Sequence, residues 1–276
     1  MGLMEFHFRL ELVEDISPWG QNPPTLGWFG LTLGWFWIEV DGEELFRYSP
    51  GILEHWSRLR PASRPMLLPY DHYPVVRYWE DLLEMLPAVL DPLPGDLAAR
   101  VADAPGWEDW QRRARRFQEA SQDPDSDEIY DMALRWWGCR TWGACHLAHP
   151  PRLWLWRVGE SVHLRWDNRD LLVDGRPVWE AKAGERTLPV SDFLDAVRSF
   201  DARFLAEMEA RVAAAGQNWS RPGIVLDQKH LQWEQQDRST WLENALTRST
   251  PDSSWDEIRA AMTVIEAGNR GGDAFP

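Results

Sequence analysis

Residues 28–42 read WFGLTLGWFWIEVDG, in which two aromatic runs are separated by a glycine and closed by an Asp-Gly pair. Aromatic and β-branched residues favour strands, and an Asp-Gly pair after such a run favours a hairpin turn. The earlier residues 6–12 alternate apolar and polar side chains, as a strand with one buried face does. We therefore predict an antiparallel meander near residues 4–48, with strands at 28–32 and 35–40.

A second strand-rich block lies near residues 152–182. Apolar runs at 153–158 and 162–166 flank a Gly-Glu turn, and shorter runs at 171–173 and 178–181 flank an Asp-Gly pair. This spacing is typical of consecutive hairpins, so we predict a second meander here.

Between and after these blocks, apolar residues recur at helical spacing. We predict helices at residues 52–59, 75–86, 107–117, 127–146, 191–216, 228–248 and 254–267. Ser191 or Asp192 is suited to cap the longest of them, and Ser254 with Glu257 matches a capping box.

These elements predict an α+β fold in which two antiparallel β meanders, or one composite sheet, pack with a helical middle and C-terminal helices. Because no low-complexity linker separates the blocks, we predict one domain over residues 1–267 in preference to two lobes. The glycine-containing stretch 268–276 is predicted to be a flexible tail.

The charge balance restricts the classes of partner. Aspartate and glutamate outnumber lysine and arginine by 44 to 29, which gives a formal net charge of -15. Non-specific binding to nucleic acid or to an anionic membrane depends on cationic side chains, so neither partner is expected. A basic protein or a cationic ligand is favoured, and the alternative is that the charge only keeps the protein soluble.

Targeting and redox signals point to a cytoplasmic protein. The first residues lack the basic start and apolar run of a secretory signal, and no apolar run reaches the roughly 18 residues of a bilayer span. The sequence holds 2 cysteines, which excludes a disulfide scaffold.

A search for chemistry finds one dense group of metal-binding residue types, at Cys139, Cys145, His146 and His149. Structural zinc sites usually pair cysteines two to four residues apart, a spacing that these cysteines do not have. We therefore predict ordinary cysteines and histidines here, with no metal and no cofactor. Nucleophile, phosphate-loop and dinucleotide-binding motifs are absent, so no catalytic residue is assigned and an enzyme is not favoured.

The 19 tryptophans are the most unusual feature of the composition. About three quarters of them fall on predicted apolar faces and should pack in the core, and the rest are available for a surface. We predict binding residues at Trp136, Trp137, Arg140, Trp166 and Asp167. For the last two, the alternative is a hairpin turn held by side-chain hydrogen bonds.

Several short patterns resemble a bacterial family of unknown function. They are PWG at 18–20, WFGLT at 28–32, RWDN at 165–168 and PVW at 177–179, and the likeness covers most of the chain. The resemblance implies no activity, because it supplies no functional residues. Members of this kind look like the small proteins that bacteria keep beside toxin genes as immunity proteins, which is an analogy of type.

Together these observations favour a non-enzymatic binding protein, of the immunity or antitoxin-like kind, that sequesters a basic partner. The alternative is a small-molecule-binding protein or an enzyme with a tryptophan-lined cleft, which should show a deep pocket and a titratable residue with a strongly shifted pKa.

Overall fold

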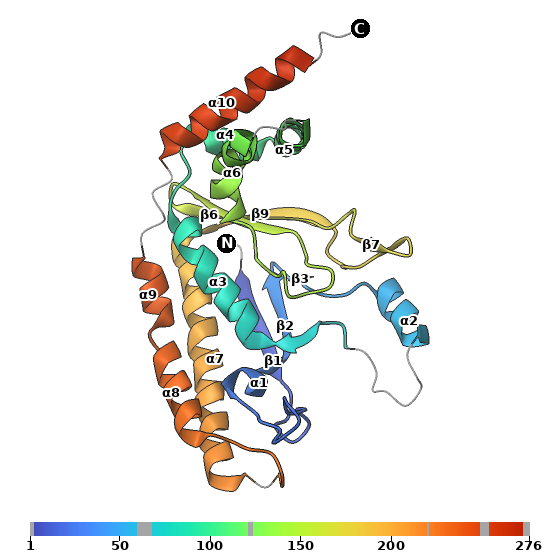
Figure 1. Ribbon diagram of the computed structural model, residues 1–276, viewed down its shortest axis with the longest axis vertical. Coiled ribbons are helices and arrows are strands. Elements are labelled where there is room, and N and C mark those ends of the chain that lie inside the picture. Colours follow the sequence, from blue (N-terminus) through green and yellow to red (C-terminus); the bar gives the residue numbers. More distant parts are fainter. Residues whose placement is uncertain (1–2, 60–67, 121–123, 220, 249–253, 273–276) are drawn as a thin grey trace.

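The structure is a computed structural model that describes residues 3–59, 68–120, 124–219, 221–248 and 254–272 (Figure 1). Antiparallel sheets pack against helices, which confirms the predicted α+β class. The two strand-rich blocks form separate sheets, so the composite-sheet alternative is wrong. Across the described ranges, no helix is long and apolar enough to cross a membrane.

The first sheet contains β1 (Met4–Leu10), β2 (Leu33–Val40), β3 (Glu43–Leu45) and β4 (His72–Pro74). β2 lies centrally and pairs antiparallel with each of the other three strands. The two-residue turn between β2 and β3 has positive φ at both Asp41 and Gly42, as a type I′ hairpin turn requires. This turn sets the register that places Glu39 opposite Glu44.

Residues 28–32, predicted as a strand, instead form the short helix α1 (Trp28–Leu31). The pairing of β2 ends at Gly34 with β1 and at Leu33 with β4, so residues 28–32 lie beyond both partner strands. Their apolar side chains are buried against helices, and the indole of Trp28 donates to Gln235 at 2.9 Å. Tertiary packing therefore overrides the strand preference of this aromatic run.

The second sheet consists of β5 (Leu153–Val158), β6 (Ser161–Asp167) and β9 (Ala183–Pro189). The predicted Asp-Gly hairpin forms a separate small ribbon of β7 (Leu172–Val173) and β8 (Arg176–Pro177). Residues 178–181 are not a strand of the second sheet, contrary to the prediction. They exchange backbone hydrogen bonds with residues 47–49 of the first block, and so link the two blocks.

The helices are α2 (Pro50–Leu59), α3 (Val75–Leu90), α4 (Gly95–Ala102), α5 (Ala104–Ala120), α6 (Pro124–Gly138), α7 (Val190–Asn218), α8 (Gln228–Arg238), α9 (Trp241–Thr247) and α10 (Trp255–Gly272). Every predicted helical stretch is found, and α4 was not predicted. α10 continues through Gly272, and residues 273–276 of the predicted flexible tail lie outside the described residues.

Several helix bounds differ from the prediction for identifiable reasons. α6 ends at Gly138 because the following residues 140–142 bond to the edge of β5. α7 begins directly after β9 at Val190, so Ser191 and Asp192 lie in its first turn and bond to each other. The predicted helix 228–248 is divided where two hydroxyl side chains bond to the preceding turn.

Pro87 lies inside α3, which continues past the predicted end at residue 86 to Leu90 and so ends shortly before Pro92. Proline lacks the N–H group that would bond to the carbonyl of Leu83. The guanidinium of Arg248 donates to that carbonyl at 3.5 Å and to the carbonyl of Glu84 at 3.3 Å. A side chain from the end of α9 thus substitutes for the missing backbone donor.

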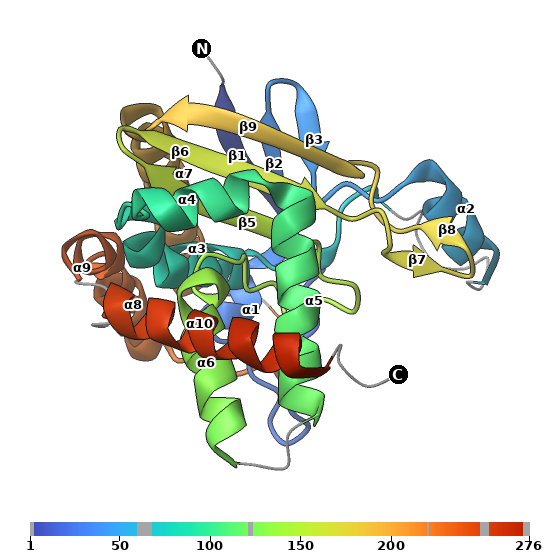
Figure 2. The ribbon, with the colours of Figure 1, turned by 90° about the horizontal axis from the view of Figure 1, so that it is seen from above.

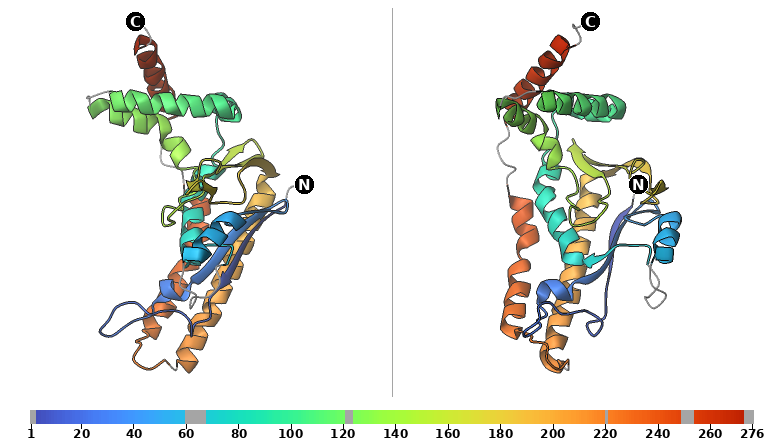
Figure 3. Two further views of the ribbon diagram at one scale, coloured as in Figure 1. Left: turned by 90° about the vertical axis from the view of Figure 1, so that its right-hand side faces the viewer. Right: turned by 45° about the vertical axis from the view of Figure 1, so that its right-hand side comes forward.

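Two hydrophobic cores share the second sheet. The larger core joins both sheets with α3 and α7, and the smaller one lies among α4, α5, α6 and α10. Alternate residues of β5 serve the two cores, since Leu155 faces the larger one and Trp156 the smaller. Figures 2 and 3 show the four helices of the smaller core gathered over the second sheet, away from the first.

Candidate functional site

Four of the five residues predicted to bind a partner lie in the interior. Trp136, Trp137, Arg140 and Trp166 are each at most 4% exposed. The three indoles fill the two cores, and the guanidinium of Arg140 is enclosed with them. These four residues therefore do not form the expected surface, and the structure does not bring Asp167 into a common site with Trp136 and Trp137.

Arg140 contacts three helices through its guanidinium group. Its guanidinium donates to the carbonyls of Trp136 at 2.7 Å and of Asp91 at 2.9 Å, and it lies 5.7 Å from the ring of Trp255. Burial lowers the pKa of Arg140 to about 10. The side chain joins the end of α3, the end of α6 and the start of α10.

Asp167 belongs to a turn held by side-chain hydrogen bonds. It accepts from the Arg169 side chain and backbone, and Arg169 lowers the pKa of the Asp167 carboxyl. The adjacent Asn168 accepts from the Arg152 N–H at 2.8 Å and donates to the Ala181 carbonyl at 2.9 Å. The turn interpretation of this segment accounts for its contacts.

The cysteine and histidine group is dispersed. Cys139 and Cys145 are free and exposed, whereas the side chain of His146 is 5% exposed. Among the residues that the structure describes, no three His, Cys, Asp or Glu side chains gather as potential metal ligands.

A different surface concentrates charge at the junction of the two blocks. We call it the acidic groove, a depression of about 340 Å³ lined by Glu39, Gly42, Glu43, Glu44, Arg47, Glu180 and Ala181. One wall is the β2–β3 hairpin, and the other is the linking segment, residues 178–181, which leads into β9. Four of its seven lining residues are glutamates.

The register of the first sheet aligns three glutamates across three adjacent strands. Glu5 of β1 lies opposite Glu39 of β2, and Glu39 lies opposite Glu44 of β3. Like charges directly opposite each other destabilise a sheet. The row borders the acidic groove, so the unfavourable arrangement is located where a positively charged partner would relieve it.

On the same face of the first sheet, the row next to these glutamates consists of stacked rings. The ring of Trp37 lies 4.3 Å from that of Tyr70 and 5.2 Å from that of His7, with nearly parallel planes. The Tyr70 hydroxyl donates to Glu44 at 2.9 Å, and His7 Nε2 lies between Glu5 and Glu39, 3.5 Å and 3.6 Å from their carboxylate oxygens. Burial and the hydrogen bond to Glu44 raise the pKa of Tyr70 to about 12. The Tyr70 ring thus orients the Glu44 carboxylate through a hydrogen bond.

Carboxylates outnumber cations around the acidic groove. Arg47 pairs with Glu44 and, at 2.7 Å, with Glu180. Arg186 of β9 lies 3.4 Å from Asp41 and 3.3 Å from Glu43. Counting the glutamates of the groove with Asp41 gives five carboxylates against these two guanidiniums, so an excess of negative charge remains.

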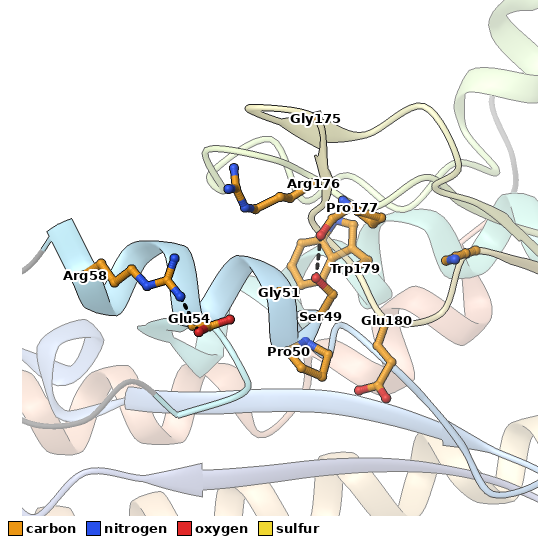
Figure 4. Close-up of a pocket in the computed structure, with 11 residues that line it drawn as sticks. Ser49, Pro50, Gly51, Glu54, Arg58, Gly175, Arg176, Pro177, Trp179 and Glu180 are labelled. Atoms are coloured by element: carbon orange, nitrogen blue, oxygen red, sulfur yellow. Dashed lines mark hydrogen bonds and ion pairs between the residues drawn. The ribbon is translucent and has the colours of Figure 1, made fainter.

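A second depression of about 460 Å³, which we call the hairpin pocket, adjoins the acidic groove and shares Glu180 with it. Figure 4 shows the Ser49 hydroxyl donating to the Pro177 carbonyl, with Trp179 behind them and Arg58 bonded to Glu54 on α2. Trp179 is 1% exposed and stacks on Tyr48 at 4.6 Å. The hairpin pocket has three cationic lining residues, Arg58, Arg176 and Lys182, and so differs in charge from the groove.

Sequence reasoning missed the acidic groove although a signal was present. The predicted Asp-Gly hairpin places Glu39 opposite Glu44 by counting outward from the turn, and the alternation of β1 places Glu5 on the same face. Glu180 could not be placed in this way, because the linking segment leaves the second sheet.

Comparison with known proteins identifies the family. No curated protein and no solved structure matches the chain. A family model does match, over residues 5–261, and this confirms the expected membership of a family of unknown function. The chain belongs to the DUF5984 family.

Proposed function

We propose that this protein is a non-enzymatic binding protein that captures a cationic segment of a protein partner in the acidic groove. The cross-strand row of Glu5, Glu39 and Glu44 carries the proposal. A sheet that serves only stability gains nothing from three like charges in register. A bound arginine or lysine side chain would convert their repulsion into attraction.

The partner class follows from the charge and shape of the groove. Its four glutamates, set on two facing walls, suit the projecting cationic side chains of a basic protein. The formal net charge of -15 would also steer a basic partner toward the molecule. We propose a cytoplasmic immunity protein that covers a basic toxin domain as the specific form of this function.

Substitution of glutamates in this row tests the proposal, because it should weaken peptide binding and at the same time stabilise the fold. The double variant Glu5→Gln, Glu39→Gln removes two charges and leaves the Glu44–Arg47 contact intact. It should bind an arginine-rich peptide about tenfold more weakly than the unmodified protein, while its free energy of unfolding rises by a few tenths to about 1 kcal/mol. Isothermal titration and urea unfolding measure the two effects.

The matched control is Glu209→Gln, which alters an exposed glutamate on α7. This variant should retain peptide affinity, and a peptide with glutamine in place of arginine should not bind. Equal binding by the double variant and the control would contradict the proposed groove. Raising the salt concentration should weaken peptide binding to the unmodified protein, because exposed charges are screened.

A further inference from the structure

A separate cavity of about 560 Å³ lies between α3 and α9, outside the acidic groove. Its volume is in the range of small-molecule sites. It is lined by Arg77, Glu80, Asp81, Leu83, Glu84, Trp241, Asn244, Ala245 and Arg248. The cavity thus combines carboxylates with an apolar wall formed by Leu83 and Ala245.

Both arginines of this cavity already have other partners. Arg77 pairs with Glu80 at 2.9 Å, and Arg248 bonds to the backbone of α3 beside Pro87. Within the described ranges, no guanidinium or ammonium nitrogen lies within 4.0 Å of the Asp81 or Glu84 carboxylate. These two residues are three apart on α3, so their carboxylates lie on the same side of the helix.

Asp81 has the less favourable environment of the two carboxylates. Its side chain is 11% exposed, and its Oδ2 atom is buried without a hydrogen bond. Oδ2 lies 3.5 Å from Nδ1 of His146. The His146 ring is enclosed by Tyr73, stacked at 4.6 Å, and by Tyr78 at 4.9 Å. Burying a carboxylate without a nearby cation is costly, and a positive charge in the adjoining cavity would offset part of this cost from the accessible side of Asp81.

The pKa values of Asp81 and His146 also show that the Asp81 carboxylate lacks a compensating positive charge. Burial raises the pKa of Asp81 to about 6, with further raising by Glu84 and Glu80 against lowering by Arg77. Burial and Arg77 lower the pKa of His146 to about 4, so the imidazole is neutral when Asp81 is ionised. At neutral pH the cavity therefore presents an ionised Asp81 without a compensating charge from His146.

We propose that this cavity binds a small aliphatic amine, with Asp81 as the principal anchor for the ammonium group and Glu84 as the second. The alkyl chain would lie against Leu83 and Ala245. This binding site is independent of the acidic groove and of the function proposed for it.

Cadaverine is a suitable probe, and 1,5-pentanediol, which has the same carbon chain without charge, is its control. Titration calorimetry on the full chain should detect cadaverine and not the diol. Affinity should rise as the pH increases through about 6, because Asp81 loses its proton there. Equal binding of the diol, or affinity that falls over this pH range, would overturn the proposal.

Variants test whether cadaverine binds in this cavity or at another acidic surface. Asp81→Asn should weaken cadaverine binding by about tenfold or more, and Glu84→Gln by a smaller factor. Glu39→Gln in the acidic groove and Asp109→Asn on α5 should leave it unchanged. Loss of binding in Glu39→Gln, or full binding in a folded Asp81→Asn protein, would overturn the assignment to this cavity.

Discussion

At the scale of single residues, the pKa of Asp81 makes stability depend on pH. The folded protein holds this pKa at about 6, above the ordinary value of 3.8. A group whose pKa is raised by folding contributes stability below its unfolded pKa, and this contribution is lost as pH rises through the folded pKa. Asp81 therefore destabilises the protein above about pH 6.

We predict that Asp81→Asn increases the free energy of unfolding by about 1–2 kcal/mol near pH 8, a value reduced for partial solvent screening. Near pH 4 the gain should disappear, because the carboxyl of the folded unmodified protein is then protonated. Urea unfolding at the two pH values checks the sign. A gain of equal size at both values would contradict the raised pKa.

A second prediction at this scale concerns Gly34. A Cβ atom at this position would collide with the carbonyl of Arg9 and the Cα of Leu10 on β1. Gly34→Ala should therefore force the paired strands apart and lower the free energy of unfolding by about 2–3 kcal/mol. Gly95→Ala is the matched control, because nothing lies within 4 Å of its added Cβ atom and no loss is expected there. Thermal denaturation distinguishes the two variants.

At the scale of elements, Arg140 joins three helices that are distant in sequence. Arg140→Met should lower the free energy of unfolding by about 2–4 kcal/mol, because it removes this donor from the buried carbonyl of Trp136 and the half-buried carbonyl of Asp91. Arg115→Met on the exposed side of α5 should change it by less than about 0.5 kcal/mol. A small effect at Arg140 would mean that water replaces the guanidinium.

Most elements were predictable because their patterns are local. The alternation in β1 and the Asp-Gly turn after β2 depend only on neighbouring residues, and the sequence therefore predicts them. β9 lacks a clear apolar alternation, since only Leu188 among its residues is buried, and it was missed. Residues 178–181 carry a strand-like pattern, yet they pair with residues that lie far away in sequence.

The candidate site was less predictable because it depends on contacts between residues that lie far apart in the sequence. Tryptophan can serve a core or a surface, and composition does not decide between them. The structure buries 10 of the 19 tryptophans, including Trp136 and Trp137. The acidic groove required the register of the first sheet together with the position of Glu180, which only the folded chain supplies.

At the scale of the whole molecule, the two cores should differ in local stability. The smaller core includes Ile258 of α10, which is fully buried among α4, α5 and α6. Ile258→Ala should cost about 2–4 kcal/mol and increase amide exchange in these helices, while β1, β2 and α7 keep their protection. Hydrogen-exchange mass spectrometry measures this pattern.

Val264→Ala on the same helix is the control, because this side chain is 45% exposed. It should leave exchange nearly unchanged. A uniform rise in exchange over both cores after Ile258→Ala would show that they unfold as one cooperative unit.

The indoles of the smaller core also give the protein an optical property. The rings of Trp107 and Trp136 lie 5.5 Å apart at 50°, and those of Trp136 and Trp137 lie 5.6 Å apart at 61°. Chromophores this close and inclined should couple their excited states, and we expect paired circular-dichroism bands of opposite sign. The assembly of α5 and α6 can thus be followed by spectroscopy without any added label.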